Sequence, residues 1–468
     1  MLYGLADSLV VLVGGFLLLP LYTAALTQQE FGSYVAVRTN LELLTYLLHF
    51  GLISAVSRLY FDYRLRGDGQ AYIVSMALWF PVQLLLVGIF LLGAGNWIWG
   101  QLSPGVAVFP NILFVFGIAA ANFYFSLTSA TLRAEQRVTL FVAVQLAAVA
   151  VLVGAAFFLL VGEQLGLYGL MGALFASAAA GALALPLAVR GGARLRLDPE
   201  HVRHSLRYAL PIVAGLMSFF ILNRISILIL QRHLPVADIA LYGLAQQIAL
   251  IIAVVAAAFG KAIQPILFSA EPERLPALMR QTMAIYVLAL SGIASLILLF
   301  GVDIIALIAP ANYRAAHPVM LVLVTAAFVY ALTLASDTAV LCMRKPGASA
   351  AITASGAALS AILSLILIPR WGLIGGAAAS LIASMVLAAA ADQMARRLTG
   401  FGNLVSALAG FAVVGATAVV ANCIYGLGVS EATALAIRCA LAVIVIAGHL
   451  AFLLKFMRAP NDRHADAS

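Results

Sequence analysis

Basic side chains stand inside long apolar stretches of this sequence, at Arg38, Arg58, Arg224 and Lys261. Asn223 precedes Arg224, and no acidic residue lies within one helical turn of either Arg224 or Lys261. Charge is costly in a hydrocarbon environment, so these unpaired cations predict a watery cavity between helices. Guanidinium and ammonium groups at several depths are suited to binding phosphate or diphosphate. We therefore predict all five residues to be substrate-binding.

Other charged residues have an opposite charge four positions away, on the same face of a helix. The pairs with this spacing are Arg38 and Glu42, Arg58 and Asp62, and Asp392 and Arg396. Local ion pairs are typical of this spacing. A simple salt bridge on the helix surface is thus the alternative to a cavity role for Arg38 and Arg58.

The remaining titratable residues give weaker signals. Asp337, about one turn inside its apolar stretch, is the carboxylate that we predict for ion coupling. Arg438 lies near the outer end of the last apolar stretch, where it can reach lipid headgroups, and we interpret His449 as a packing residue. His201 and His204 have i, i+3 spacing without a cysteine or carboxylate constellation, so we predict a solvated basic loop and no metal site. No nucleotide-binding loop or nucleophile elbow is present, so we predict no cofactor and no enzymatic activity.

The elements that must position these residues follow from composition. Of 468 residues, 64% are hydrophobic and 9% are charged, and the mean hydropathy of +1.09 excludes an average soluble protein. The net charge of +8 comes from short clusters without interleaved aromatic residues, which argues against nucleic acid as a partner. Because a bilayer needs about 20 apolar residues per helix, we predict an all-α integral membrane protein with about fourteen transmembrane helices. The predicted spans lie near 5–26, 38–61, 71–93, 106–131, 139–161, 168–189, 208–231, 241–269, 282–309, 317–342, 348–368, 373–395, 404–425 and 435–457.

The two halves of the chain resemble each other at an offset of about 208 residues, which is typical of a transporter built by duplication. Residues 30–36 match 238–244, and the small-residue segment 166–173 matches 372–379. An even number of spans in each half predicts parallel six-helix repeats with a cavity between them. The predicted domains are a six-helix lobe at 1–189, a cytoplasmic basic linker at 190–207, a second lobe at 208–398, an accessory helix pair at 399–457 and a cytoplasmic tail at 458–468.

Arginine and lysine residues are much more frequent in the connections on one side of the predicted spans. Since cytoplasmic loops carry the excess of positive charge, we predict that both termini are cytoplasmic. The outer connections are too short to form a domain.

Several passages resemble the oligosaccharide flippase family, the polysaccharide exporters of the MOP superfamily. They are residues 19–21, 29–34, 50–58 (FGLISAVSR) and 132–137 (LRAEQR) in the first half, and 223–224, 241–245 and 367–378 in the second. This resemblance implies a MATE-like fold. It also implies alternating access through a cationic central cavity, with a polyprenyl-pyrophosphate-linked oligosaccharide moved from the cytoplasmic to the outer leaflet of the bacterial inner membrane. The family often has an acidic residue where this sequence has Asn223, so we predict no coupling carboxylate there.

In this setting, surface polysaccharide biosynthesis is the implied pathway, and a glycan polymerase and assembly proteins are the implied partners. A MATE-type multidrug or cation antiporter is one alternative, but its cavity should carry carboxylates where this chain has mainly basic residues. A lipid II flippase of the same superfamily is the closer alternative, and the sequence does not separate it from an oligosaccharide flippase. A membrane glycan polymerase or ligase would need a larger outer loop.

Overall fold

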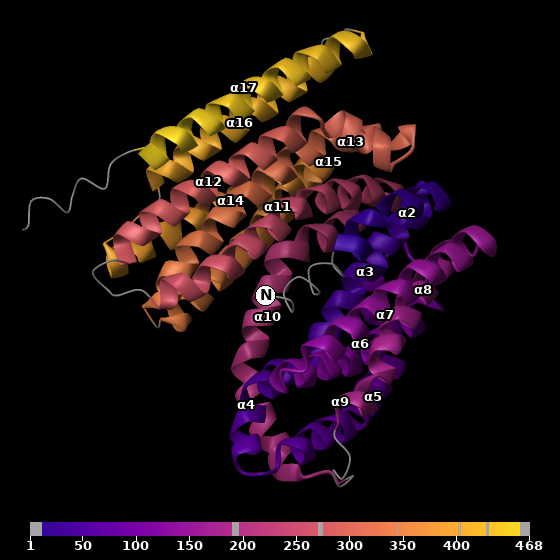
Figure 1. The fold of residues 1–468 in the computed structure, drawn as a ribbon. Coiled ribbons are helices and arrows are strands. Elements are labelled where there is room, and N and C mark those ends of the chain that lie inside the picture. The colour runs from indigo at the N-terminus through magenta and orange to yellow at the C-terminus, as the bar shows by residue number, and fades with distance from the viewer. Residues whose placement is uncertain are drawn as a thin grey trace, which may run out of the picture. The chain divides into compact units, whose positions relative to one another are not determined.

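The computed structural model describes residues 12–189, 196–269, 275–343, 345–400, 402, 404–426 and 430–458. Every regular element in these ranges is a helix (Figure 1). The chain divides into two compact units by its internal contacts. The first unit contains Met1–Leu244, Ile308–Pro310 and Thr353–Ala379. The second contains Ala245–Leu307, Ala311–Ile352 and Ser380–Ser468. Parts of the predicted first span, linker and tail, at 1–11, 190–195 and 459–468, lie outside the described residues.

The helices of the first half are η1 (Val13–Leu17), α2 (Leu19–Ala25), α3 (Gln28–His49), α4 (Leu52–Leu65), α5 (Gly69–Leu102), α6 (Asn111–Ala134), α7 (Val138–Ala156), η2 (Phe157–Gly162), α8 (Gly166–Leu183), α9 (Leu185–Ala188) and α10 (Pro199–His233). Those of the second half are α11 (Val236–Phe268), α12 (Leu275–Leu299), α13 (Gly301–Ile308), η3 (Ala311–Ala316), α14 (His317–Cys342), α15 (Pro346–Thr399), α16 (Leu404–Gly426) and α17 (Glu431–Arg458).

The described residues contain 12 helical stretches that are long and apolar enough to cross a membrane, and Val13–Ala25 is a shorter apolar helix. One of the 12, α15, is two helices that meet at Gly372, where the backbone is not helical. Together these segments account for the predicted fourteen spans, and the all-α membrane architecture is confirmed.

The second predicted span is not one helix. Its first part, α3, starts with a capping box in which Thr27 and Glu30 satisfy each other's backbone N–H groups. It ends at Phe50 and Gly51, which have φ values of 45° and 68°, and α4 begins immediately after them. A Cβ atom at Gly51 would lie 3.1 Å from the carbonyl oxygen of Ala209 in α10. The prediction of a continuous helix over 38–61 is therefore wrong, because a left-handed turn breaks it where α10 packs closely.

The first span is also interrupted. A π-helical turn, η1, ends at Leu18, and α2 then starts with Pro20 in its first turn. Proline is tolerated there because the first N–H groups of a helix have no intrahelical partner. At Pro211, by contrast, α10 continues through the proline.

The duplicated segments share backbone geometry as well as sequence. Gly166, which opens α8, and Gly372, which opens the second helix of α15, have φ values of 55° and 56°. A Cβ atom at either Gly169 or Gly375, three residues further on, would collide with a backbone carbonyl oxygen of the preceding helix. Both repeats therefore need glycine at the same two places, one for chain direction and one for close packing.

The amino-terminal end of α10 corrects one prediction. His201 and His204 lie in this helix and not in a solvated loop. His201 is 6% exposed, and its Nδ1 lies 3.1 Å from the Ser75 hydroxyl of α5. The Nδ1 of His204 lies 3.0 Å from the Tyr63 hydroxyl of α4. The two histidines thus connect α10 to α4 and α5. The sequence analysis missed these contacts because the many basic residues of the segment suggested a solvated loop.

In the second unit, the carboxy-terminal pair α16 and α17 packs on α12 (Figure 1). His449 fills a packing position as predicted, with its Nε2 lying 3.0 Å from the Ser291 hydroxyl. Arg438 does not reach out to headgroups: it is 7% exposed and its NH1 donates to Asp303 Oδ2 at 2.7 Å. Because Asp303 lies on α13, the two charges neutralise each other at the junction of α13 and α17.

Candidate functional site

Polar side chains follow one another along a single face of α3, at Tyr34, Arg38, Glu42 and Tyr46. Residues four apart in a helix lie above one another on the same face. Tyr34 is 4% exposed, whereas the other three are half-buried. The α3 face therefore carries a phenol, a cation, an anion and a second phenol in sequence through an otherwise apolar membrane helix.

Arg38 keeps most of its hydrogen-bonding capacity. Its NH1 donates to the Tyr34 hydroxyl at 3.0 Å, and its guanidinium carbon lies 5.9 Å from the centre of the Tyr34 ring. The guanidinium carries five N–H donors, and no other partner for them is present among the described residues. Nearby, the Tyr22 ring of α2 lies 6.0 Å from that of Tyr34. The Tyr22 hydroxyl is buried and, within the described ranges, has no hydrogen-bond partner.

Arg224 is paired, contrary to prediction. Its Nε donates to Glu42 Oε2 at 2.6 Å, across from α10 to α3, and the two side chains are 23% and 28% exposed. The acidic partner lies 182 positions away in sequence, so a search within one helical turn missed it. Glu42 therefore serves Arg224, and Arg38, which it attracts electrostatically, forms no ion pair with it within the described part of the chain.

The other predicted residues of the first unit form hydrogen bonds within their own helices. Asn223 donates from Nδ2 to the Phe219 carbonyl oxygen at 2.9 Å. Arg58 NH1 donates to Asp62 Oδ1 at 2.9 Å, and the two side chains are 59% and 43% exposed. This local pair was the predicted alternative and is confirmed, as is that of Asp392 and Arg396, at 2.7 Å. Arg58 lies on α4, beyond the break that ends α3.

Lys261 and Asp337 belong to the second unit. Lys261, on α11, is exposed and makes no hydrogen bond or ion pair with any residue that the structure describes. Asp337, on α14, is half-buried and interacts with the Ser349 hydroxyl at the start of α15. In the first unit, Glu42 thus pairs with Arg224 and attracts Arg38. Lys261 and Asp337 belong to the second unit and are not part of this group.

Aromatic residues of this site escaped the sequence analysis. Besides Tyr22 and Tyr34, the Tyr46 ring lies 6.2 Å from that of Phe220 on α10, edge to face, and Tyr46 interacts with both Glu42 and Arg224. The regular spacing of four along α3 was the available signal. Tyrosine combines an apolar ring with a hydrogen-bonding hydroxyl, which suits a partly wet surface inside a membrane protein.

Comparison with known proteins agrees with this architecture. The model of the polysaccharide biosynthesis protein family matches residues 5–271, which is more than half of the chain. The chain belongs to this family. None of the curated protein sequences matches it.

Solved structures show that this family member has the fold of the MOP superfamily, as the sequence predicted. The lipid II flippase MurJ in an inward closed conformation is similar with a TM-score of 0.76 at 11% identity, over 97% of this chain and 99% of that one. An outward-facing multidrug resistance MATE transporter of the MOP superfamily is similar with a TM-score of 0.56 at 17% identity, over 89% and 94%. A Vibrio cholerae MATE transporter is similar with a TM-score of 0.60 at 14% sequence identity, over 85% of this chain and 94% of that one.

Proposed function

We propose that this family member is a flippase for a polyprenyl-pyrophosphate-linked oligosaccharide, moving it from the cytoplasmic to the outer leaflet of the bacterial plasma membrane for surface polysaccharide biosynthesis. The observation that carries the proposal is the α3 face, where Arg38 has unused donors beside the buried Tyr22 hydroxyl. Family membership and the transporter fold support it. A glycan polymerase and assembly proteins would receive the product, and the chain itself performs no covalent chemistry.

The chemistry of this face suits a diphosphate. Guanidinium groups bind phosphate oxygens through two parallel N–H donors, and Arg38 has such donors available. Arg224 is held by Glu42 at 2.6 Å. A diphosphate that replaced Glu42 as the partner of Arg224 would exchange one charge-assisted pair for another, so Arg224 would stay paired, and Glu42 would be left beside Arg38, which it already attracts. Asn223, Arg58 and Lys261 would add weaker contacts at other depths, and Asp337 would take part in ion coupling.

A lipid II flippase is the second candidate, favoured by the TM-score of 0.76 to MurJ. Its substrate carries the same polyprenyl diphosphate with a different glycan, so the α3 face does not separate the two. A multidrug or cation antiporter of the MATE type fits less well, because Arg38 is the group of this face with open hydrogen-bonding capacity, and it would repel a cationic drug.

The test is transport in proteoliposomes that contain the purified full-length protein. Either a lipid-linked oligosaccharide or lipid II is supplied, and its arrival in the opposite leaflet is measured with a membrane-impermeant glycosidase or lectin. We expect transport of the oligosaccharide lipid and expect Arg38→Gln to reduce it at least about tenfold, because it removes charge-assisted hydrogen bonds to the diphosphate.

Arg232→Gln is the matched control, since Arg232 lies on α10 and donates to Gln101 outside the α3 face. This variant should transport at the wild-type rate. Preferential transport of lipid II would reassign the substrate to the second candidate. Full transport by Arg38→Gln at equal protein level would overturn the role of the α3 face.

A further inference from the structure

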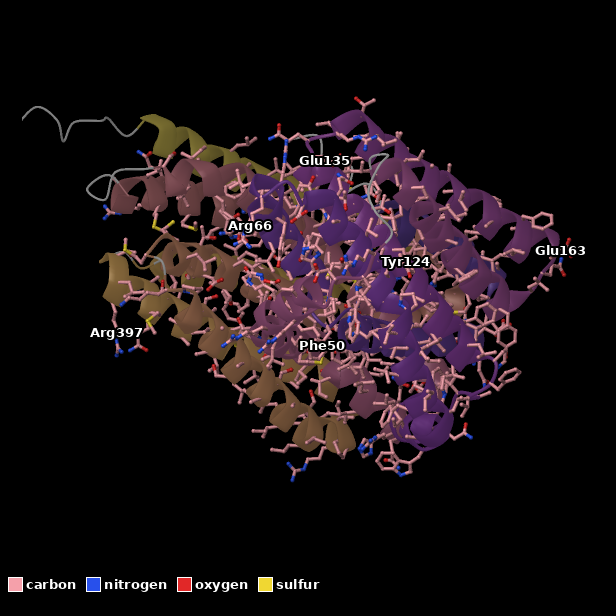
Figure 2. The ribbon with its side chains drawn as sticks, turned by 90° about the horizontal axis from the view of Figure 1, so that it is seen from below. Phe50, Arg66, Tyr124, Glu135, Glu163 and Arg397 are labelled. Carbon is pink, nitrogen blue, oxygen red and sulfur yellow. The ribbon has the colours of Figure 1, made fainter. Side chains whose placement is uncertain are left out.

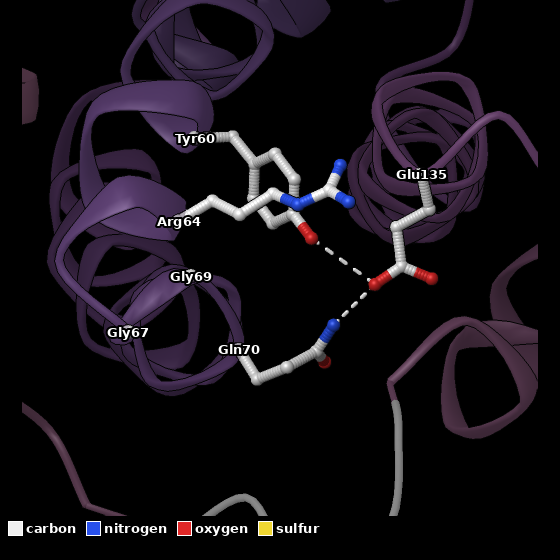
Figure 3. Close-up of a pocket in the computed structure, with 6 residues that line it drawn as sticks. All are labelled: Tyr60, Arg64, Gly67, Gly69, Gln70 and Glu135. Atoms are coloured by element: carbon white, nitrogen blue, oxygen red, sulfur yellow. Dashed lines mark hydrogen bonds between the residues drawn. The ribbon is translucent and has the colours of Figure 1, made fainter.

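A small pocket lies at one end of the first unit, away from the α3 face. It is lined by Tyr60 and Arg64 from α4, by Gly67, Gly69 and Gln70 from the turn into α5, and by Glu135 at the end of α6 (Figure 3). Three apolar helices stop here together, at Leu65, Gly69 and Ala134. The ends of spanning helices mark the level of the lipid headgroups. The segment Val138–Gly162 is long and apolar enough to cross a membrane. Glu135 and Glu163, which lie apart in Figure 2, come just before and just after it in sequence, so we expect the pocket at one membrane boundary.

Glu135 forms a fixed anionic wall of this pocket. Its side chain is only 4% exposed. Oε1 accepts hydrogen bonds from the Tyr60 hydroxyl, at 3.1 Å, and from Gln70 Nε2. Oε2 lies 3.5 Å from Arg137 NH1. These donors on α4, α5 and the α6–α7 turn fix the position of the carboxylate.

Arg64 forms the opposite, cationic wall. Its side chain is exposed and reaches across the pocket toward Glu135 (Figure 3). Despite that direction it makes no ion pair with Glu135 or with any other residue that the structure describes. A cation and an anion therefore face each other across a cavity of about 170 Å³ without meeting. This volume is below the range of about 300–1,000 Å³ for drug-sized ligands, so the space suits a small group that carries both charges.

The turn between the two walls leaves space beside the start of α5, although the N–H groups of Gly67 and Asp68 donate within the turn. Gly67 has a φ of 85°, and a Cβ atom placed on it would meet nothing within 4 Å. Asp68 precedes α5 without capping it through its side chain, and the first N–H groups of a helix have no intrahelical partner. Backbone donors thus stand beside Arg64 and add to its attraction for a phosphate group.

We infer that this pocket binds the headgroup of a zwitterionic aminophospholipid, of the phosphoethanolamine class. The primary ammonium group pairs with Glu135, and the phosphate lies against Arg64 and the start of α5. A membrane lipid is the source because the pocket opens where the helices leave the bilayer. A primary ammonium is required because its N–H groups can donate to the carboxylate, which a trimethylated ammonium cannot do.

The experiment is lipid-dependent thermal unfolding of the full-length protein in detergent micelles. Phosphatidylethanolamine, phosphatidylcholine and phosphatidylglycerol with identical acyl chains are added in turn, together with soluble glycerophosphoethanolamine in a separate series. We expect phosphatidylethanolamine to raise Tm at concentrations about tenfold lower than the other two lipids, since only it satisfies both walls. Arg64→Gln should raise the concentration of phosphatidylethanolamine that is needed by about tenfold, because it removes the cation that holds the phosphate, and Glu135→Gln should bring the three lipids to within about twofold of one another.

Arg66→Gln is the matched control. Arg66 is exposed on the same turn, but its guanidinium lies 5.8 Å from the centre of the Tyr63 ring and does not line the pocket. It should respond to phosphatidylethanolamine at the wild-type concentration and keep the preference for this lipid. Because Glu135 also accepts hydrogen bonds from Tyr60 and Gln70, Glu135→Gln is tested beside Arg64→Gln, whose exposed side chain makes no ion pair with any residue that the structure describes. Equal stabilisation by phosphatidylglycerol, a wild-type response to phosphatidylethanolamine in Arg64→Gln, a preference retained in Glu135→Gln, or stabilisation by the soluble headgroup without the lipid would each overturn the assignment.

Discussion

Glu42 is the residue on which the electrostatics of the α3 face depends. It accepts from Arg224 at 2.6 Å and attracts Arg38 one turn away. A lone charge in the membrane interior is expensive, whereas a paired one is tolerated. The single carboxylate thus allows two arginines to lie half-buried among apolar helices, with Arg224 paired and Arg38 attracted from one turn away.

This role predicts strong coupling between Glu42 and Arg224. Glu42→Gln leaves Arg224 without its carboxylate, and Arg224→Gln leaves Glu42 without its cation, so each single variant should unfold at a lower temperature than the wild type. The double variant should recover part of the loss. A double-mutant cycle of unfolding free energies should give a coupling of about 0.5–3 kcal/mol, and additive losses would contradict the pairing.

At the scale of elements, interruptions of helices are placed where other helices pack. The break between α3 and α4 at Phe50 and Gly51 faces Ala209 of α10. The α8 and α15 helices each start from a glycine with positive φ. Breaks in membrane helices persist only where protein neighbours satisfy the freed backbone. Each interruption therefore changes the direction of a helix at a position that packs against protein and does not face lipid.

The Gly51 break gives a prediction with an internal control. Gly51→Ala should destabilise the protein by the cost of a left-handed alanine, about 1–2 kcal/mol, and by a further amount from the contact with Ala209. Gly67→Ala carries the first cost alone, because Gly67 also has positive φ but an open surrounding. Thermal unfolding of both purified variants should show the larger loss for Gly51→Ala, and an equal loss would mean that the packing contact contributes nothing.

At the scale of the whole molecule, the duplication is geometric but not electrostatic. Tyr34 of α3 corresponds to Tyr242 of α11 at the offset of about 208 residues, whereas Arg38 and Glu42 correspond to Gln246 and Leu250. The charged face therefore belongs to the first repeat alone. An asymmetric pair of repeats suits a substrate with one charged end, such as a lipid-linked diphosphate.

The orientation of the whole chain in the membrane can be tested directly. The concentration of basic residues in connections on one side predicts both termini in the cytoplasm. A fluorescent protein fused after residue 468 should therefore mature and fluoresce. Alkaline phosphatase inserted within residues 103–110, between α5 and α6, should be active. Active phosphatase at the carboxy terminus would reverse the orientation.

The sequence alone was enough to predict the features that depend on the length of apolar segments, on the charge content and on the recurrence of glycines. These properties can be read along the chain without knowing its fold. The lipid bilayer sets the helix length directly, so the fourteen spans and the membrane class could be predicted. Local pairs such as Arg58 with Asp62 could also be predicted, because helical geometry alone brings residues four apart together.

Only the tertiary structure decided which distant charges meet. The pairs of Arg224 with Glu42 and of Arg438 with Asp303 join helices that are remote in sequence. The burial of His201 and the pocket between Arg64 and Glu135 likewise arise from helix packing. Desolvation makes a charge in a membrane seek a partner wherever packing brings one, and no periodicity in the sequence records that choice. Of the two arginines at the α3 face that first indicated a cavity, the fold pairs Arg224 with a carboxylate, and it leaves Arg38 with hydrogen-bond donors that no other described residue uses.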